Sequence, residues 1–162
     1  MKRTLVLVRH GKSIWADTDL PDRERPLAER GKRYAPMMGR RLAQEGVIPD
    51  LILSSPACRA RETARLLADA LQYPGEIALD ERIYEGEVRT LLALIGELAD
   101  DKKCVMLVGH DPEFTALAHR FSRGITRMPT CAVARFLFEG ASWSVIPDRV
   151  PVRVWFDCPK QP

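Results

Sequence analysis

The sequence has no long apolar segment, and this absence limits the classes of protein to which it can belong. No stretch of its 162 residues approaches the roughly 20 apolar residues that a membrane-spanning helix requires. The apolar run at the start, within Met1–Leu5, is too short for a secretory signal peptide. We therefore expect a cytoplasmic protein that does not use a membrane as a partner.

Cysteine is sparse, and its spacing fits neither a disulfide framework nor a metal site. The sequence has four cysteines that lie far apart, at Cys58, Cys104, Cys131 and Cys158. Close pairs with metal-ligand spacing are missing, and so is a cluster of carboxylates dedicated to a metal. We predict reduced thiols, as in a cytoplasmic protein, and expect neither a metal nor another cofactor.

A concentration of charge of one sign is also missing. The 25 Lys and Arg residues exceed the 22 Asp and Glu residues by a net charge of only +3, and they are spread along the chain. Binding to nucleic acid usually needs a concentrated basic face, so we do not expect nucleic acid as a partner. The modest positive charge is compatible with anionic small ligands or with acidic patches on proteins.

The order of apolar segments predicts one α/β domain without repeats or linkers. Apolar runs predict strands at 4–8, 51–53, 77–79 and 104–108, and helical periodicity predicts helices at 27–46, 60–71, 88–98 and 113–121. The polar segment 11–26 is typical of a loop, and Pro36 predicts a kink or a restart in the first helix. Residues 132–138 predict an edge strand, with 142–146 and 152–156 as antiparallel partners. We expect a three-layer α/β/α sandwich with a mostly parallel central sheet and an antiparallel C-terminal edge.

Three apolar runs are each followed by residues that suit a phosphoryl group. Arg9-His10-Gly11 follows the first, a segment with Arg59 follows the second, and Gly109-His110-Asp111 follows the third. In open α/β sheets ligands bind at the rim where parallel strands end. The planar guanidinium of arginine matches phosphate, and a neutral imidazole can form a covalent phosphohistidine that water later hydrolyses. The sequence therefore predicts phosphoryl transfer by a histidine nucleophile among fixed cations.

These residues resemble the motifs of the histidine phosphatase superfamily, whose fold is of the phosphoglycerate-mutase type. The similar segments occur in the family's order: Arg9-His10-Gly11, Pro26-Leu27-Ala28-Glu29-Arg30-Gly31, Ser55-Pro56-x-x-Arg59-Ala60-x-x-Thr63 and Gly109-His110. The resemblance implies that His10 is the phosphorylated nucleophile. It also implies that Arg9, Arg59 and His110 hold the phosphoryl oxygens, while Gly11 lets the backbone approach the site.

The resemblance leaves the proton donor open between three carboxyl groups. The run Leu79-Asp80-Glu81-Arg82 is similar to the segment that carries the donor in mutase relatives, which implies Glu81. In the acid-phosphatase branch the donor directly follows the second histidine, which implies Asp111. Glu85 lies close enough to Glu81 in sequence to compete for this role.

The length of the chain narrows the class of substrate. The segment between Arg59 and His110 has room for a helix, a strand and a helix, but not for a cap over the site. We expect a single histidine phosphatase domain over residues 1–162 without a cap insertion. Such a domain resembles the small bacterial phosphohistidine phosphatases of the SixA type. The resemblance implies a role in signal transduction, with phosphohistidine on a protein phosphotransfer domain as the substrate.

Two other functions stay open at this point. The same residues could hydrolyse a small phosphorylated metabolite, such as a sugar phosphate or a nucleotide. A non-catalytic module that only binds phosphate is a further alternative. A module of this kind has no need of a nucleophile, and the set of His10, Arg59 and His110 therefore argues against it.

Overall fold

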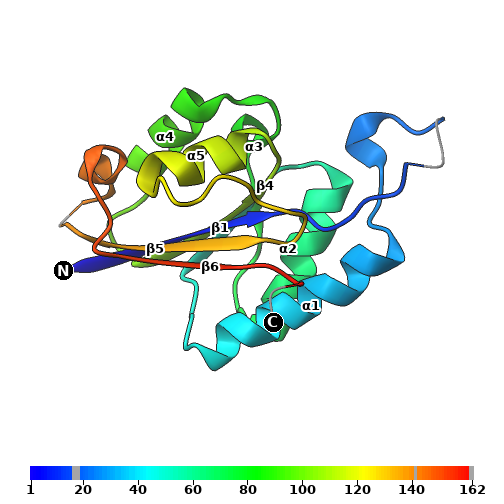
Figure 1. Ribbon diagram of the computed structural model, residues 1–162, viewed down its shortest axis with the longest axis horizontal. Helices are drawn as coiled ribbons and strands as arrows, with labels where there is room; N and C mark the ends of the chain where they lie inside the picture. The colour runs from blue at the N-terminus through cyan, green and yellow to red at the C-terminus, as the bar shows by residue number, and fades with distance from the viewer. Residues whose placement is uncertain (16–18, 141, 161–162) are drawn as a thin grey trace.

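A mixed β-sheet forms the centre of the molecule, with helices on both of its faces (Figure 1). The computed structural model describes residues 1–15, 19–140 and 142–160. In these residues six strands lie in the order β3-β2-β4-β1-β5-β6, with the bounds β1 (Lys2–Arg9), β2 (Leu51–Ser54), β3 (Ala78–Leu79), β4 (Cys104–Gly109), β5 (Val133–Glu139) and β6 (Arg153–Asp157). The first four strands pair in parallel, and β5 and β6 add antiparallel pairs. The expected α/β fold with an antiparallel C-terminal edge is confirmed.

The alternating side chains of β1 explain why its sequence is a nearly continuous apolar run. Leu5 and Leu7 pack into the core on one face of the sheet, and Val6 and Val8 pack into the core on the other. Strands that are covered on both faces have this kind of sequence. Figure 1 shows the two helical layers, which consist of α1 (Glu29–Gln44) and α2 (Cys58–Leu71) on one side and α3 (Glu81–Glu85), α4 (Val88–Gly96) and α5 (Glu113–Phe121) on the other.

The parallel strands carry the candidate site residues to one rim of the sheet. Arg9 pairs with Gly109 at the carboxyl ends of β1 and β4, and Ser54 pairs with Val108 where β2 ends. The residues after these three strands therefore emerge side by side. The polar segment between β1 and α1 passes near this rim and contains the short 3-10 helix η1 (Asp22–Glu24). Residues 16–18 of the predicted loop lie outside the described residues.

Of the two outcomes predicted at Pro36, a kink or a restart, the restart is wrong, because α1 continues through the proline. It is a single helix of 16 residues with Pro36 inside it. A proline removes one backbone donor, but the buried side of α1 continues across this position with Ala35, Met38 and Leu42. Packing of this side against the sheet outweighs the lost hydrogen bond, as tertiary contacts commonly do for local preferences.

The C-terminal region contains two further differences. The predicted edge strand is internal, because β5 pairs with β1 on one side and β6 on the other. The segment predicted as a strand at 142–146 belongs instead to the 3-10 helix η2 (Trp143–Asp148). Trp143 is fully buried there, and its indole Nε1 donates to the Lys102 carbonyl at 2.6 Å. A long-range contact of this kind leaves no periodic signal in the sequence.

None of the helices in the described part of the chain combines the length and the hydropathy that crossing a membrane requires.

Candidate active site

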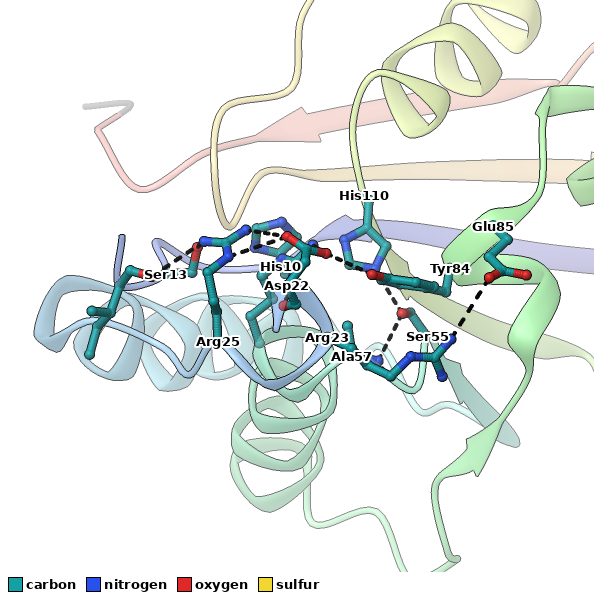
Figure 2. Close-up of polar contacts among 12 residues, drawn as sticks. His10, Ser13, Asp22, Arg23, Arg25, Ser55, Ala57, Tyr84, Glu85 and His110 are labelled. Carbon is teal, nitrogen blue, oxygen red and sulfur yellow. Dashed lines mark hydrogen bonds and ion pairs between the residues drawn. The ribbon is translucent and has the colours of Figure 1, made fainter. Parts of the chain in front are cut away.

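Two histidines from neighbouring strand ends face one another at the rim of the sheet. His10 follows β1 and His110 follows β4, and the amide of His10 donates to the Gly109 carbonyl at 3.0 Å. Their ring centroids are 5.1 Å apart, and each residue is only 8% exposed. Figure 2 shows both rings beside polar side chains from other segments. The pairing of β1 with β4 thus fixes the spacing of the two imidazoles.

The hydrogen bond of His10 determines which of its ring nitrogens can act as a nucleophile. Nδ1 lies 2.7 Å from the carbonyl oxygen of Gly11, which can only accept a hydrogen bond. Nδ1 therefore carries the proton, and the neutral ring keeps a lone pair on Nε2. Burial lowers the pKa of His10, the hydrogen bond to Gly11 opposes this effect, and nearby His110, Arg59 and Arg9 add to it, so that the pKa is about 3. The ring is neutral at physiological pH, as a nucleophile must be.

His110 is held by the residue that follows β2. Its Nε2 lies 2.7 Å from Ser55 Oγ, and this oxygen also accepts from the Ala57 amide at 3.1 Å. The Ser55 amide donates to the Val108 carbonyl, so three adjacent strand ends are linked. Burial lowers the pKa of His110 to about 4, and Arg59 acts in the same direction. Both imidazoles are thus neutral, and the fixed positive charge comes from arginines.

The two predicted arginines come from separate elements. Arg9 ends β1, and its Nη1 donates to the Met128 carbonyl at 2.9 Å and lies 3.7 Å from Asp111 Oδ2. Arg59 lies in the first turn of α2, and its Nη1 and Nη2 donate to the main-chain oxygen and the carboxylate of Asp22. Among the described residues, three buried nitrogens of the site have no hydrogen-bond partner: Nε of Arg9, Nε of Arg59 and Nδ1 of His110.

These side chains line one cavity of about 280 Å³. Five of the predicted residues meet there, and the full lining consists of Arg9, His10, Lys12, Ser13, Trp15, Asp22, Arg25, Arg59, His110, Asp111 and Thr130. The predicted Glu81 and Glu85 are not among the lining residues. Glu81 accepts hydrogen bonds from Arg23, and its side chain is 54% exposed. Of the three candidate proton donors, the structure therefore brings only Asp111 to the cavity.

Two glycines of the predicted motifs allow α1 to pack against the segment after His10. A Cβ atom on Gly31 would lie 2.5 Å from the Lys12 carbonyl oxygen, and one on Gly11 would lie 3.0 Å from Gly31 Cα. The Gly11 amide also donates to Thr63 Oγ1 at 2.9 Å, which ties the segment to α2. Close backbone approach, rather than a turn, accounts for both glycines.

Sequence reasoning missed four polar residues in or beside the cavity. Arg25 donates to Ser13 Oγ and to the Asp22 carboxylate, and Tyr84 donates to the same carboxylate at 2.7 Å. The Cζ atom of Arg25 lies 3.7 Å from the ring centroid of Trp15, which lines the cavity and is 67% exposed. For Arg25, the sequence signal that could have indicated a place near the site was its position directly before the Pro26-Leu27 motif.

A larger cavity of about 440 Å³ contains neither histidine. It is lined by residues of α1, of the segment before β5 and of the end of β6, among them Arg30, Tyr34 and Phe156. Within the described residues, no three His, Cys, Asp or Glu side chains form a group that could hold a metal ion. We assign the candidate active site to the smaller cavity, because the neutral imidazoles and the arginines lie there.

Solved structures of similar fold include proteins of the SixA type. A protein from Agrobacterium tumefaciens that has been assigned as the phosphohistidine phosphatase SixA superposes with a TM-score of 0.76 at 30% sequence identity, covering 83% of this chain and 90% of that chain. A protein from Nakamurella multipartitia with the same assignment gives a TM-score of 0.84 at 23% identity, with 99% of this chain and 98% of that chain covered. A phosphoglycerate mutase from Bacillus anthracis, at a TM-score of 0.69 and 16% identity, covers 90% of this chain and 95% of that chain. The chain thus has a phosphoglycerate-mutase-like fold.

Sequence relatives and a family model agree with the fold. An uncharacterized chloroplastic protein of Arabidopsis thaliana is 29% identical over 155 residues, which cover 88% of this chain and 70% of that protein. An uncharacterized protein of Mycobacterium tuberculosis is 36% identical over 111 residues, covering 68% of this chain and 67% of that protein. Residues 5–92 match the model of the histidine phosphatase superfamily (branch 1), and the chain belongs to this superfamily.

Proposed function

We propose that the protein is a phosphohistidine phosphatase that needs no metal and works through a phosphorylated His10. The observation that carries the proposal is the hydrogen bond from His10 Nδ1 to the Gly11 carbonyl, because it leaves Nε2 as the nucleophilic atom of a ring that lines the cavity. Arg9, Arg59 and His110 contribute buried nitrogens without partners among the described residues. Unpaired buried donors are costly, and phosphoryl oxygens are acceptors that satisfy them.

In the first step His10 Nε2 attacks phosphorus, and the bond between phosphorus and the leaving nitrogen breaks. The phosphoryl group moves to His10, the guanidinium groups of Arg9 and Arg59 stabilise the charge on its oxygens, and the leaving imidazole takes up one proton. In the second step water attacks phosphorus, the bond between phosphorus and His10 Nε2 breaks, and the proton of the water passes to the carboxylate that protonated the leaving imidazole in the first step. Inorganic phosphate leaves, and Nε2 recovers its lone pair.

Asp111 is the carboxyl group that best fits the role of proton donor in this reaction. It lines the cavity, and its carboxylate is placed by the amide and hydroxyl of Thr115 at 3.0 and 2.9 Å. Glu81 is engaged with Arg23 outside the lining. A leaving imidazole has an unperturbed pKa of about 6.5, so its protonation demands little from the donor.

The proposed substrate is phosphohistidine on a protein, and residues 1–162 act as one domain without a cap. Between the end of α2 at Leu71 and the start of β4 at Cys104 the chain forms only β3, α3 and α4. The last of these packs against η2, which follows the distal end of β5, and not over the cavity. An uncapped rim admits a phosphorylated side chain of another protein, and the similarity to SixA structures supports this choice of substrate.

Trapping of the phosphoenzyme tests the mechanism. Denaturing quench during turnover of a ³²P-labelled substrate should yield a phosphoprotein that is labile in acid and stable in base, as phosphohistidine is. Replacement His10→Ala should abolish both this species and turnover. His119→Ala is the matched control, since His119 bonds to the Ile125 carbonyl and does not line the cavity. Appreciable turnover by His10→Ala, or loss of activity in a chelator with rescue by a divalent ion, would contradict the mechanism.

A second candidate function is hydrolysis of small phosphomonoesters, and the same open cavity favours it. A substrate panel separates the two functions. We expect kcat/KM for a histidine-phosphorylated phosphotransfer domain to exceed that for sugar phosphates and nucleotides at least tenfold. The reverse order would assign the protein to small esters while leaving the role of His10 intact.

A further inference from the structure

The carboxylate of Asp22 pairs with two of the three arginines that line the cavity, Arg25 and Arg59. Its oxygens accept from Arg25 Nη2 at 2.9 Å, from Arg59 Nη2 at 3.1 Å and from the Tyr84 hydroxyl at 2.7 Å. Figure 2 shows this carboxylate between the guanidinium of Arg25 and the phenol of Tyr84. The planar guanidinium pairs with carboxylate and with phosphate through the same donor geometry.

The charge of Asp22 is secure under ordinary conditions. Burial acts to raise its pKa, but the hydrogen bonds from Tyr84, Arg25 and Arg59 outweigh this effect and place the pKa well below its usual range. A permanent carboxylate and a phosphoryl dianion would repel each other at the same cations. Because like charges repel, each of the two weakens the binding of the other to Arg59.

The carboxylate is the partner that can leave. The side chain of Asp22 is 50% exposed, whereas those of Arg25 and Arg59 are only 8% exposed. Asp22 belongs to the three-residue helix η1, which has no side-chain cap at its start. If Asp22 rotated into solvent, its hydrogen bonds would break, but water would solvate its charge. The buried guanidiniums of Arg25 and Arg59 would then need another anion as a partner.

We propose that Asp22 is an intramolecular competitor for the phosphoryl site, which pairs the buried guanidiniums when no substrate is bound, leaves when the phosphoryl group arrives, and returns to displace inorganic phosphate. This role rests on the proposed function, because it assigns the site to a phosphoryl group. The competition lowers the apparent affinity for every anion by the same factor, since only the conformation in which Asp22 is displaced can bind an anion. Its benefit is rapid release of product and protection from ambient anions.

Calorimetric titration with inorganic phosphate tests this inference without any turnover. In Asp22→Asn the neutral amide should compete less well, because it lacks the charge with which the carboxylate attracts the guanidiniums of Arg25 and Arg59. We expect phosphate to bind about tenfold more tightly and to inhibit turnover of p-nitrophenyl phosphate at correspondingly lower concentration. The matched control is Glu24→Gln, which removes the same charge from the exposed side of η1 and should change the affinity less than twofold.

A second variant keeps the carboxylate and weakens its attachment. Tyr84→Phe removes one hydrogen bond to Asp22, and Tyr84 is not among the residues that line the cavity. It should tighten phosphate binding two- to threefold. Unchanged or weaker binding in a folded Asp22→Asn protein would overturn the inference, because Asp22 would then merely order the arginines. That result alongside a trapped phosphoenzyme would refute this role alone, whereas tighter phosphate binding without any phosphoenzyme would refute the proposed mechanism alone.

Discussion

The two imidazoles of the cavity follow strands of the sheet, whereas the carboxylate of Asp22 comes from the loop between β1 and α1. His10 and His110 directly follow paired strands and are hydrogen-bonded to main chain or to Ser55, and both are almost completely buried. Asp22 belongs to η1, between β1 and α1, and its side chain is half exposed. The sheet thus fixes the positions of the two imidazole rings, whereas the loop that carries Asp22 determines which anion binds the arginines. Rigid elements suit reacting atoms, and loops suit exchange of ligands.

The pKa values of the two histidines and of Asp22 are all low, but for opposite reasons. Burial disfavours the charged form of His10 and His110, so these rings lose their protons. For Asp22 burial acts against the charged form too, but donation from Tyr84 and two arginines prevails, so the carboxylate keeps its charge. A neutral nucleophile can therefore coexist with permanent cations in one cavity.

After loss of the nucleophile His10 itself, the largest effect should come from replacing the second histidine, His110. We expect His110→Ala to lower kcat about 10³-fold on every substrate, because it removes a group that stabilises developing charge on the phosphoryl oxygens. Ser55→Ala leaves the ring in place and removes only its hydrogen-bond partner, so we expect a loss of about tenfold. Steady-state kinetics with p-nitrophenyl phosphate measures both. A larger loss for Ser55→Ala than for His110→Ala would show that the ring itself does not bind the phosphoryl group.

A smaller effect should distinguish the two candidate proton donors, Asp111 after β4 and Glu81, which is bound by Arg23 of η1. Asp111→Asn should lower turnover of a phosphomonoester about tenfold and of phosphohistidine less than threefold, because an alkoxide needs a proton far more than an imidazole does. Glu81→Gln should change both rates less than twofold, since its carboxylate is occupied by Arg23. The opposite ranking would mean that η1 moves during the reaction and releases Glu81 to donate.

The sequence predicted the strand-borne half of the site and little of the other half. An apolar run such as the one before His10 identifies a buried strand, and its end places the next residue at the rim, so position follows from pattern. Arg25 and Asp22 have no such pattern, because their places depend on how a loop folds back over α2 and α3. The same limit explains why the segment with Trp143 was predicted as a strand, since its burial in η2 depends on a contact with Lys102.

The pH dependence of stability distinguishes the buried histidines from Asp22 once more. The unfolded rings of His10 and His110 take up protons below pH 6.5, whereas the folded rings stay neutral until about pH 3 and 4. The unfolded state therefore binds more protons in this window, and the free energy of unfolding should fall with decreasing pH by up to about 1.4 kcal/mol per pH unit for each ring.

Asp22 contributes in a different window, because its pKa in the unfolded state is about 3.9 and its folded pKa is lower. Its stabilisation is complete above pH 5 and is lost only as the pH falls below that value. Urea unfolding between pH 7 and pH 5 should therefore report the imidazoles alone: His10→Asn should flatten the pH dependence, and Asp22→Asn should leave its slope unchanged. A slope for His10→Asn equal to that of the unmodified protein would mean that the folded His10 ring takes up its proton in the same pH range as the unfolded ring, and a neutral His10 nucleophile would then be excluded at the lower end of this range.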